Sequence, residues 1–209
     1  MPAPPRPSVL YAVIAVLSWP VMRLFFRLRA RGTEHLPTEG GFVLAANHMS
    51  NLDPWPLGIP LFPRRYLRFM AKSELFWPPL GWIVSGGGGF PVRRGEHDTE
   101  AIETAVRLVR DGHVVVMFPE GTRRVKGLHK KHEARPRTGA ARIAFEAGVP
   151  LVPAGIAGTD RLARLAPLRV AYGQPVPIDD LRGRDPHEVG QEATDRLTTA
   201  IDELEGSLA

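Results

Sequence analysis

The chain has 209 residues, no cysteine and a formal net charge of +5. This length suits one domain with one sizeable core, and the missing cysteine excludes disulfides, thiolate metal sites and a cysteine nucleophile. The charge is uneven: residues 1–33 hold five Arg and no acid, residues 34–173 carry a net charge of +6, and residues 174–209 carry −6. A positive surface favours anionic substrates or anionic lipid. We expect no nucleic-acid partner, because the sequence has no helix-turn-helix pattern, RNA-stacking motif or zinc finger.

The N-terminal segment is uncharged and mostly apolar over residues 7–22. This is short for a membrane span, which takes roughly 20 apolar residues, and Pro20 is expected to end or kink a helix. Arg23 and Arg27 follow, four residues apart and therefore on one face of a continuing helix. We predict a helix that lies in the membrane interface, with its apolar side down and its Arg side chains at the head groups. The alternatives are a buried core helix and a single short span.

Further along, short apolar runs alternate with amphipathic ones. The predicted strands are residues 42–46, 67–70, 90–92, 114–118, 151–156 and 168–172. The predicted helices are residues 101–109, 138–147 and a long C-terminal helix after Asp185. This alternation predicts an α/β fold with a mostly parallel central sheet flanked by helices, and with antiparallel strands possible at its edges. We assign residues 1–31 to a membrane-associating helical segment and residues 32–209 to a single α/β domain.

The first chemical motif is His48 and Asp53, directly after the strand predicted at 42–46. If His48 lies on the turn after the strand and the loop folds back, Asp53 can accept a hydrogen bond from one ring nitrogen. The other nitrogen is then free to take a proton, as in a catalytic triad without its serine. The alternative is that Asp53 is the N-cap of a helix that begins with Pro54, and that His48 is a surface histidine.

The second motif is Phe118–Arg123, Phe-Pro-Glu-Gly-Thr-Arg, which ends another predicted strand in a turn. The carboxyl ends of strands in an open α/β sheet are where ligands bind. Arg123 can hold a phosphate through two parallel hydrogen bonds, and Glu120 can accept hydrogen bonds from substrate hydroxyls. Backbone N–H groups around Gly121 can face an oxyanion. The alternative is a salt-bridged surface turn.

Two other patterns do not support cofactor or metal binding. The glycine run at residues 86–89 precedes a strand, whereas a dinucleotide loop has the strand before its glycines and a helix after them. The run leads to Arg93 and Arg94, which are candidate phosphate ligands or a solvated pair. His129 and His132 lie in a lysine-rich loop, which disfavours a cation, so we expect no metal site.

The ordered motifs resemble the glycerolipid acyltransferase family, typified by bacterial lysophosphatidate acyltransferases. His48 to Asp53 resembles the family's His-x4-Asp block, and residues 87–93 its Gly-x-x-Phe-x-Val-Arg block. Residues 118–123 match the third block without a mismatch, and residues 149–153 resemble the fourth. Residues 71–75 resemble a further recurring segment. Any block alone is weak evidence, but the ordered set, over about residues 42–160, is specific.

The resemblance implies that His48, oriented by Asp53, deprotonates an acceptor hydroxyl that attacks an acyl thioester directly, with no acyl-enzyme. It assigns the acceptor phosphate to Lys72, Arg93 and Arg123, and the glycerol hydroxyl to Glu120. Gly121 and Thr122 complete this substrate-binding turn. Met49 departs from the family pattern, in which Gln is common after the motif His, but it carries no proton, so we expect the chemistry to be retained.

The same resemblance implies the partners: a phospholipid membrane, acyl-CoA or acyl carrier protein, and a lysophosphatidate-like acceptor. No cofactor is expected beyond the thioester co-substrate, and the expected location is the cytoplasmic face of the cell membrane, as a peripheral or monotopic protein. Rival hypotheses are another acceptor, such as glycerol-3-phosphate or a different lysolipid, and a non-catalytic lipid-binding relative.

Overall fold

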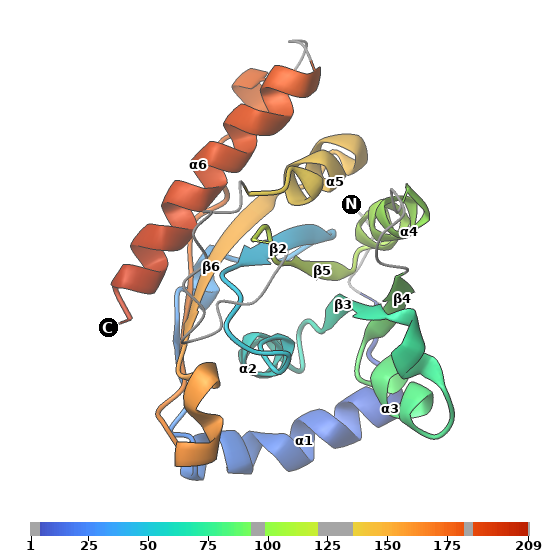
Figure 1. Ribbon diagram of the computed structural model, residues 1–209, viewed down its shortest axis with the longest axis vertical. Coiled ribbons are helices and arrows are strands. Elements are labelled where there is room, and N and C mark those ends of the chain that lie inside the picture. The colour runs from blue at the N-terminus through green and yellow to red at the C-terminus, as the bar shows by residue number, and fades with distance from the viewer. Residues whose placement is uncertain (1–4, 93–98, 121–135, 182–185, 209) are drawn as a thin grey trace.

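A seven-stranded sheet forms the centre of the molecule (Figure 1). The computed structural model describes residues 5–92, 99–120, 136–181 and 186–208. The strand order is β1-β7-β6-β2-β5-β3-β4. The strands are β1 (Arg29–Arg31), β2 (Phe42–Ala46), β3 (Leu67–Lys72), β4 (Gly89–Val92), β5 (Val114–Met117), β6 (Leu151–Ala157) and β7 (Arg169–Tyr172).

The sheet is mostly parallel, which confirms the predicted fold class. Only the β6–β7 pair is antiparallel among the described strands. The central strand β2 is buried along its whole length, as its uninterrupted apolar run requires. All six predicted strands are present, although β5 ends at Met117, so Phe118 lies just beyond it. The edge strand β1 was not predicted, because its three residues, Arg-Ala-Arg, are all exposed and give no apolar signal.

Helices cover both faces of the sheet (Figure 1). One core cluster contains buried side chains of α4 (Thr99–Arg110), α5 (Gly139–Ala147) and α6 (Pro186–Gly206). The other contains residues of α1 (Val9–Leu24) and α2 (Pro54–Gly58), with α3 (Leu80–Gly86) beside α1. Short 3-10 helices complete the described chain: η1 (Thr33–His35), η2 (Ile59–Leu61), η3 (Ser73–Phe76), η4 (Thr159–Arg164) and η5 (Asp179–Leu181).

The N-terminal helix α1 differs from expectation in two ways. It continues through Pro20 to Leu24, so the proline does not end it. Arg27 lies outside the helix with a φ of 48°, so Arg23 and Arg27 do not share a helical face. Only Ala15 of α1 is fully buried, which excludes the alternative of a buried core helix. No helix in the described part of the chain has the length and hydropathy to cross a membrane.

The glycine run makes a tight, ordered connection from α3 to β4. Gly88 has a φ of 100°, a conformation that glycine adopts without steric cost. A Cβ at Gly88 would lie 2.2 Å from the carbonyl oxygen of Leu67, the first residue of β3. The bare backbone at this position therefore allows β4 to pair closely with β3.

Candidate active site

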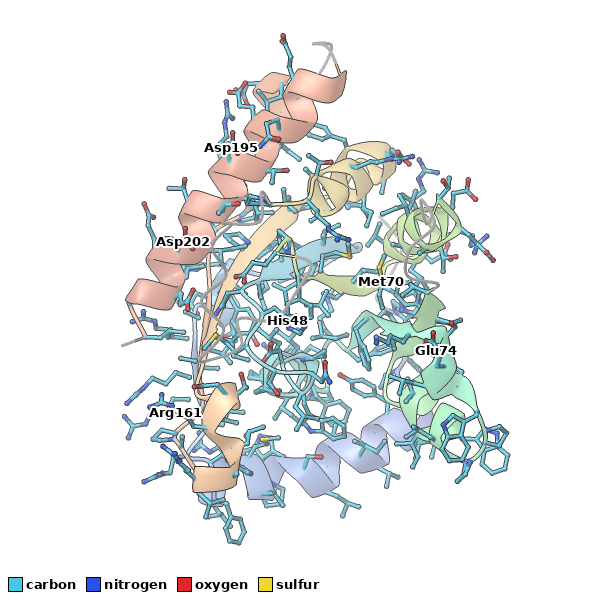
Figure 2. The ribbon with its side chains drawn as sticks, viewed as in Figure 1. His48, Met70, Glu74, Arg161, Asp195 and Asp202 are labelled. Carbon is cyan, nitrogen blue, oxygen red and sulfur yellow. The ribbon has the colours of Figure 1, made fainter. Side chains whose placement is uncertain are left out.

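His48 and Phe118 follow neighbouring parallel strands, β2 and β5. β2 leads into α2 on one face of the sheet, whereas the next described helix after β5, α5, packs on the other face. Strands whose connections diverge in this way leave a crevice at their carboxyl ends, where α/β proteins bind ligands. Figure 2 shows His48 near the centre of the molecule, beside α2.

The loop after β2 folds back so that Asp53 meets His48. Nδ1 of His48 lies 2.8 Å from Oδ2 of Asp53. The same carboxylate oxygen accepts hydrogen bonds from the backbone N–H groups of Met49 and Ser50, both at 2.8 Å. Asp53 directly precedes α2, but its side chain makes no hydrogen bond to the first turn of that helix. Pro54 begins α2 and Asp53 occupies its N-cap position, as the alternative predicted. The carboxylate does not cap the helix, however, because it is used within its own loop.

The second oxygen of Asp53 is held from the other side. The Thr159 hydroxyl, at the start of η4, donates a hydrogen bond to Oδ1 over 2.6 Å. Asp53 is fully buried, and Thr159 is 3% exposed. A buried carboxylate with this number of donors is fixed in position and keeps its hydrogen-bonding capacity filled.

The base of the loop is also fixed. Asn47 is fully buried, and its side chain donates to the carbonyl oxygen of Ile156 and accepts from the Ile156 N–H. This pair of bonds holds the end of β2 to the end of β6. Asn47, next to His48 in the chain, and Thr159, bonded to Asp53, therefore connect the loop to β6 and to the segment that follows it.

This arrangement determines the role of each histidine nitrogen. An ionised carboxylate can only accept hydrogen bonds, so the proton between Nδ1 and Asp53 belongs to His48. The lone pair of the neutral ring is then on Nε2. The ring stacks on Phe118, with centroids 4.1 Å apart and planes 21° apart. The side chain is 12% exposed, so an oriented base reaches the surface at the strand ends.

The other predicted site residues are only partly described. Lys72 is exposed at the carboxyl end of β3, next to β5 on the same edge of the sheet. Glu120 is half-buried, three residues beyond β5, and engaged in a contact. Arg93, Gly121, Thr122 and Arg123 lie outside the described residues. In the described ranges no three His, Asp or Glu side chains gather into a metal site.

Two contributors to the site were not predicted from the sequence. Phe118 was part of the second motif, but nothing in its spacing indicated that it would stack on His48. Thr159 lies more than 100 residues from Asp53, at the start of η4, in a segment without a recognisable motif. No sequence signal could have paired it with Asp53, because the pairing depends on β2 and β6 being adjacent.

An apolar cavity of about 210 Å³ lies next to the loop that carries His48. Its walls come from α1, the loop before α2, β3 and α3. Trp55 is one of its lining residues, and its indole Nε1 is buried with no hydrogen-bond partner in the described part of the chain. The cavity therefore offers an elongated apolar chain a place beside the loop that carries His48.

Comparison with known proteins identifies the family. The Acyltransferase family profile matches residues 27–157, more than half of the chain. A 1-acyl-sn-glycerol-3-phosphate acyltransferase of Bacillus subtilis is 32% identical over 181 residues, which cover 84% of this chain and 86% of that protein. The human 1-acyl-sn-glycerol-3-phosphate acyltransferase beta is 31% identical over 148 residues, 67% of this chain and 51% of its own length.

A solved structure agrees with these matches. The crystal structure of the 1-acyl-sn-glycerophosphate (LPA) acyltransferase PlsC from Thermotoga maritima superposes with a TM-score of 0.66 and 26% sequence identity. The match covers 93% of this chain and 79% of that one. The resemblance inferred from the ordered motifs is confirmed, and the chain belongs to the acyltransferase family.

Proposed function

We propose that this protein is an O-acyltransferase that moves a fatty acyl group from an acyl thioester to the free hydroxyl of a lysophosphatidate-like acceptor, making phosphatidate for phospholipid synthesis. The observation that carries the proposal is the His48–Asp53 pair at the carboxyl edge of the sheet. It occurs in a chain that matches the Bacillus 1-acyl-sn-glycerol-3-phosphate acyltransferase over most of both lengths.

His48 acts as general base in this reaction. Its Nε2 takes the proton of the acceptor hydroxyl, and the oxygen attacks the thioester carbonyl carbon. The new C–O bond forms, the C–S bond breaks, and the proton passes from His48 to the leaving thiolate of coenzyme A or acyl carrier protein. Asp53 holds the ring and stabilises its positive charge between the two proton transfers. The reaction forms no acyl-enzyme and needs no cofactor.

The acceptor phosphate binds to Lys72, Arg93 and Arg123, and Glu120 accepts a hydrogen bond from the glycerol part. The exposed position of Lys72 on the same sheet edge as His48 supports this assignment. The net charge of +6 over residues 34–173 also supports it, because a positive surface attracts a phosphorylated lipid. Gly121 and Thr122 belong to the same binding turn.

A fatty acyl chain occupies the apolar cavity beside the catalytic loop. Side chains of α1, β3 and α3 line it, including Ile14, Phe69 and Val84. The removal of a hydrocarbon chain from water is favourable in proportion to the area buried.

The protein works at a phospholipid membrane, on the cytoplasmic face where acyl-CoA and acyl carrier protein occur, as a peripheral or monotopic protein. The exposed apolar side chains of α1 support this location, and so does the absence of any acidic residue among residues 1–33. An apolar helix face with basic neighbours binds anionic membranes in the interface.

The test is an incubation of the purified protein with acyl-CoA or acyl carrier protein donors and three acceptors: lysophosphatidate, glycerol-3-phosphate and lysophosphatidylcholine. Product masses should show phosphatidate and release of free thiol. Acylation of another acceptor in preference to lysophosphatidate would replace the proposed substrate with that one. No thioester consumption with any acceptor, by protein bound to vesicles, would favour the non-catalytic lipid-binding alternative.

A further inference from the structure

In the described part of the chain, the large exposed apolar side chains gather on one side. All large exposed hydrophobic residues in the described ranges lie on α1 and the residue after it, in the loop at Leu52, in the segment from η3 to α3, or at Leu165. None lies on the described parts of α4, α5 or α6. In Figure 1 α1 and α3 lie along one edge of the molecule, and α4, α5 and α6 lie on the opposite side of the sheet. Contiguous exposed apolar surface of this kind marks a contact with a partner or a membrane.

The segment Ser73–Gly86, from η3 to the end of α3, supplies the largest of these side chains. Trp77 and Trp82 are 59% and 69% exposed, and Leu75 and Ile83 are exposed beside them. The segment carries a single acidic residue, Glu74. Two exposed indoles on one short segment are costly in water and suit a membrane interface, where an amphipathic ring has one apolar and one wet side.

This segment is fixed to α1. The Ser8 hydroxyl donates a hydrogen bond to the carbonyl oxygen of Gly86 over 3.2 Å. A Cβ on Gly86 would lie 2.2 Å from Cδ2 of Leu10, so the two helices approach as closely as a glycine permits. α1 and α3 therefore present their exposed side chains together, as one surface.

The apolar cavity connects to the same surface. Leu75 and Ile83 line the cavity and are also exposed, as is Leu52 from the loop after His48. Side chains that both line a cavity and are exposed to solvent form its mouth. The mouth thus lies between α3, α1 and the catalytic loop, on the side that carries the exposed apolar residues.

We infer that Ser73–Gly86 is a second lipid-docking element, which inserts Trp77 and Trp82 into the membrane interface beside α1 and places the cavity mouth against the lipid. This inference rests on the proposed function for its choice of a membrane as the partner. α1 binds the bilayer along most of this surface, and Ser73–Gly86 binds it at the far end. Two points of attachment fix the orientation of the molecule, so that the mouth cannot tilt away from the bilayer.

Charge favours lipid over a second copy of the chain as the occupant. Arg23 lies over the Trp19 ring at 5.5 Å, and Arg27 follows the helix. The first 33 residues hold five Arg and no acid, and Ser73–Gly86 adds only Glu74, so a symmetric dimer through this surface would bring together an excess of positive charge. Anionic head groups supply the missing negative charge.

The test uses the absence of cysteine, which allows a single fluorescent reporter at any chosen position. Trp82→Cys and Asp195→Cys are each labelled with an environment-sensitive dye, the second on α6 far from α1 (Figure 2). The full-length protein is added to vesicles of phosphatidylcholine and phosphatidylglycerol, some carrying a nitroxide quencher on their acyl chains. The dye at position 82 should shift to the blue and be quenched, and the dye at position 195 should be unchanged.

A matched pair of variants measures the contribution of the indoles. W77S/W82S should weaken vesicle binding by at least roughly tenfold, whereas W77F/W82F, which keeps aromatic rings, should bind much more like the wild type. Circular dichroism and thermal unfolding verify that each variant folds.

The outcomes separate this inference from the proposed function. Vesicle binding with an unquenched dye at position 82 overturns the docking element and leaves the acyltransferase proposal intact. A position-82 dye that shifts without vesicles, together with a doubled mass in sedimentation, assigns the surface to a second copy instead. Quenching in a protein that transfers no acyl group supports the docking element although the proposed activity has failed.

Discussion

The Thr159 hydroxyl donates a hydrogen bond to Oδ1 of Asp53 over 2.6 Å, although 106 residues separate them in the chain. Oδ2 of the same carboxylate faces His48 and two backbone N–H groups. Each oxygen is thus held from a different strand end, β2 for one and β6 for the other. The orientation of His48 therefore depends on the pairing of β2 with β6 in the sheet as well as on the motif loop.

Thr159→Val should lower kcat by roughly tenfold with little change in KM. The substitution keeps the shape of the side chain but leaves one oxygen of a buried carboxylate without its donor, which costs about 1–3 kcal/mol. Steady-state kinetics and urea unfolding measure both effects. Thr159→Ser should restore most of the activity, because it retains the hydroxyl. Full activity in the valine variant would show that Asp53 does not need this bond.

His48→Ala should reduce thioester consumption by at least roughly 10²-fold, the loss expected for a general base. The ring is partly exposed, and without it Oδ2 of Asp53 still accepts from the N–H groups of Met49 and Ser50, so the unfolding midpoint should change little. His35→Ala is the control, since His35 lies by β7 and bonds to the carbonyl oxygen of Tyr172. Turnover near the wild-type value in His48→Ala would refute the proposed mechanism.

His113 should make the fold less stable at acid pH. Burial lowers its pKa from the ordinary value of 6.5, and the positive charge of Arg68 lowers it further, against a smaller opposing effect of Asp111. The unfolded chain therefore binds a proton at His113 before the folded protein does, so unfolding is favoured as the pH falls below about 6.5. Its contribution is present above this pH and is lost as the pH falls through the lowered pKa.

The pH dependence of the free energy of unfolding checks this, measured in urea from pH 8 to pH 5 in the wild type and in His113→Phe. Phenylalanine retains a ring for the edge contact with Tyr66, whose centroid lies 5.4 Å away. The variant should lose less stability between pH 7 and pH 5 than the wild type. Equal slopes would mean that His113 protonates equally well in both states.

Gly88→Ala should destabilise the fold more than Gly148→Ala. Both glycines have positive φ, 100° and 68°, so an alanine pays a backbone cost of about 1–2 kcal/mol at either position. Gly148 has no atom within 4 Å of an added Cβ, whereas Gly88 has the Leu67 carbonyl oxygen at 2.2 Å. Thermal unfolding of the two variants isolates the steric contribution. An equal shift in both would show that the β3–β4 connection moves aside freely.

Leu17→Glu should release the protein from anionic vesicles, because it puts a charge in the middle of the exposed apolar face of α1. Thr199→Glu on exposed α6 surface is the control and should leave binding unchanged. Sedimentation of the protein with vesicles measures the bound fraction. Undiminished binding of the Leu17 variant would show that α1 is not the anchor.

The sequence was most informative where a periodic pattern and a buried position coincide. β2 and β6 were predicted because strands buried on both faces are continuous apolar runs. β1 was missed because a short edge strand with exposed Arg side chains has no such run. Pro20 does not end α1, which continues for four more residues to Leu24.

The candidate site divides in the same way. The His48–Asp53 contact followed from local spacing, since five residues fold back within one loop. The bonds from Asn47 to Ile156 and from Thr159 to Asp53 depend on which strands are neighbours. Local pattern does not encode strand order, so these contacts became visible only in the folded chain.

Only four residues connect the end of α1 to the start of β1. Within this joint Leu28 is buried and donates to the Met22 carbonyl oxygen, and the Phe26 carbonyl oxygen accepts from Leu168, just before β7. Because this connection is short and hydrogen-bonded at both ends, it holds α1 rigidly against the sheet. A surface that binds α1 therefore also fixes the height and the tilt of the sheet above it. The distance of His48 from that surface is then set by the fold, whereas a flexible tether would let it vary.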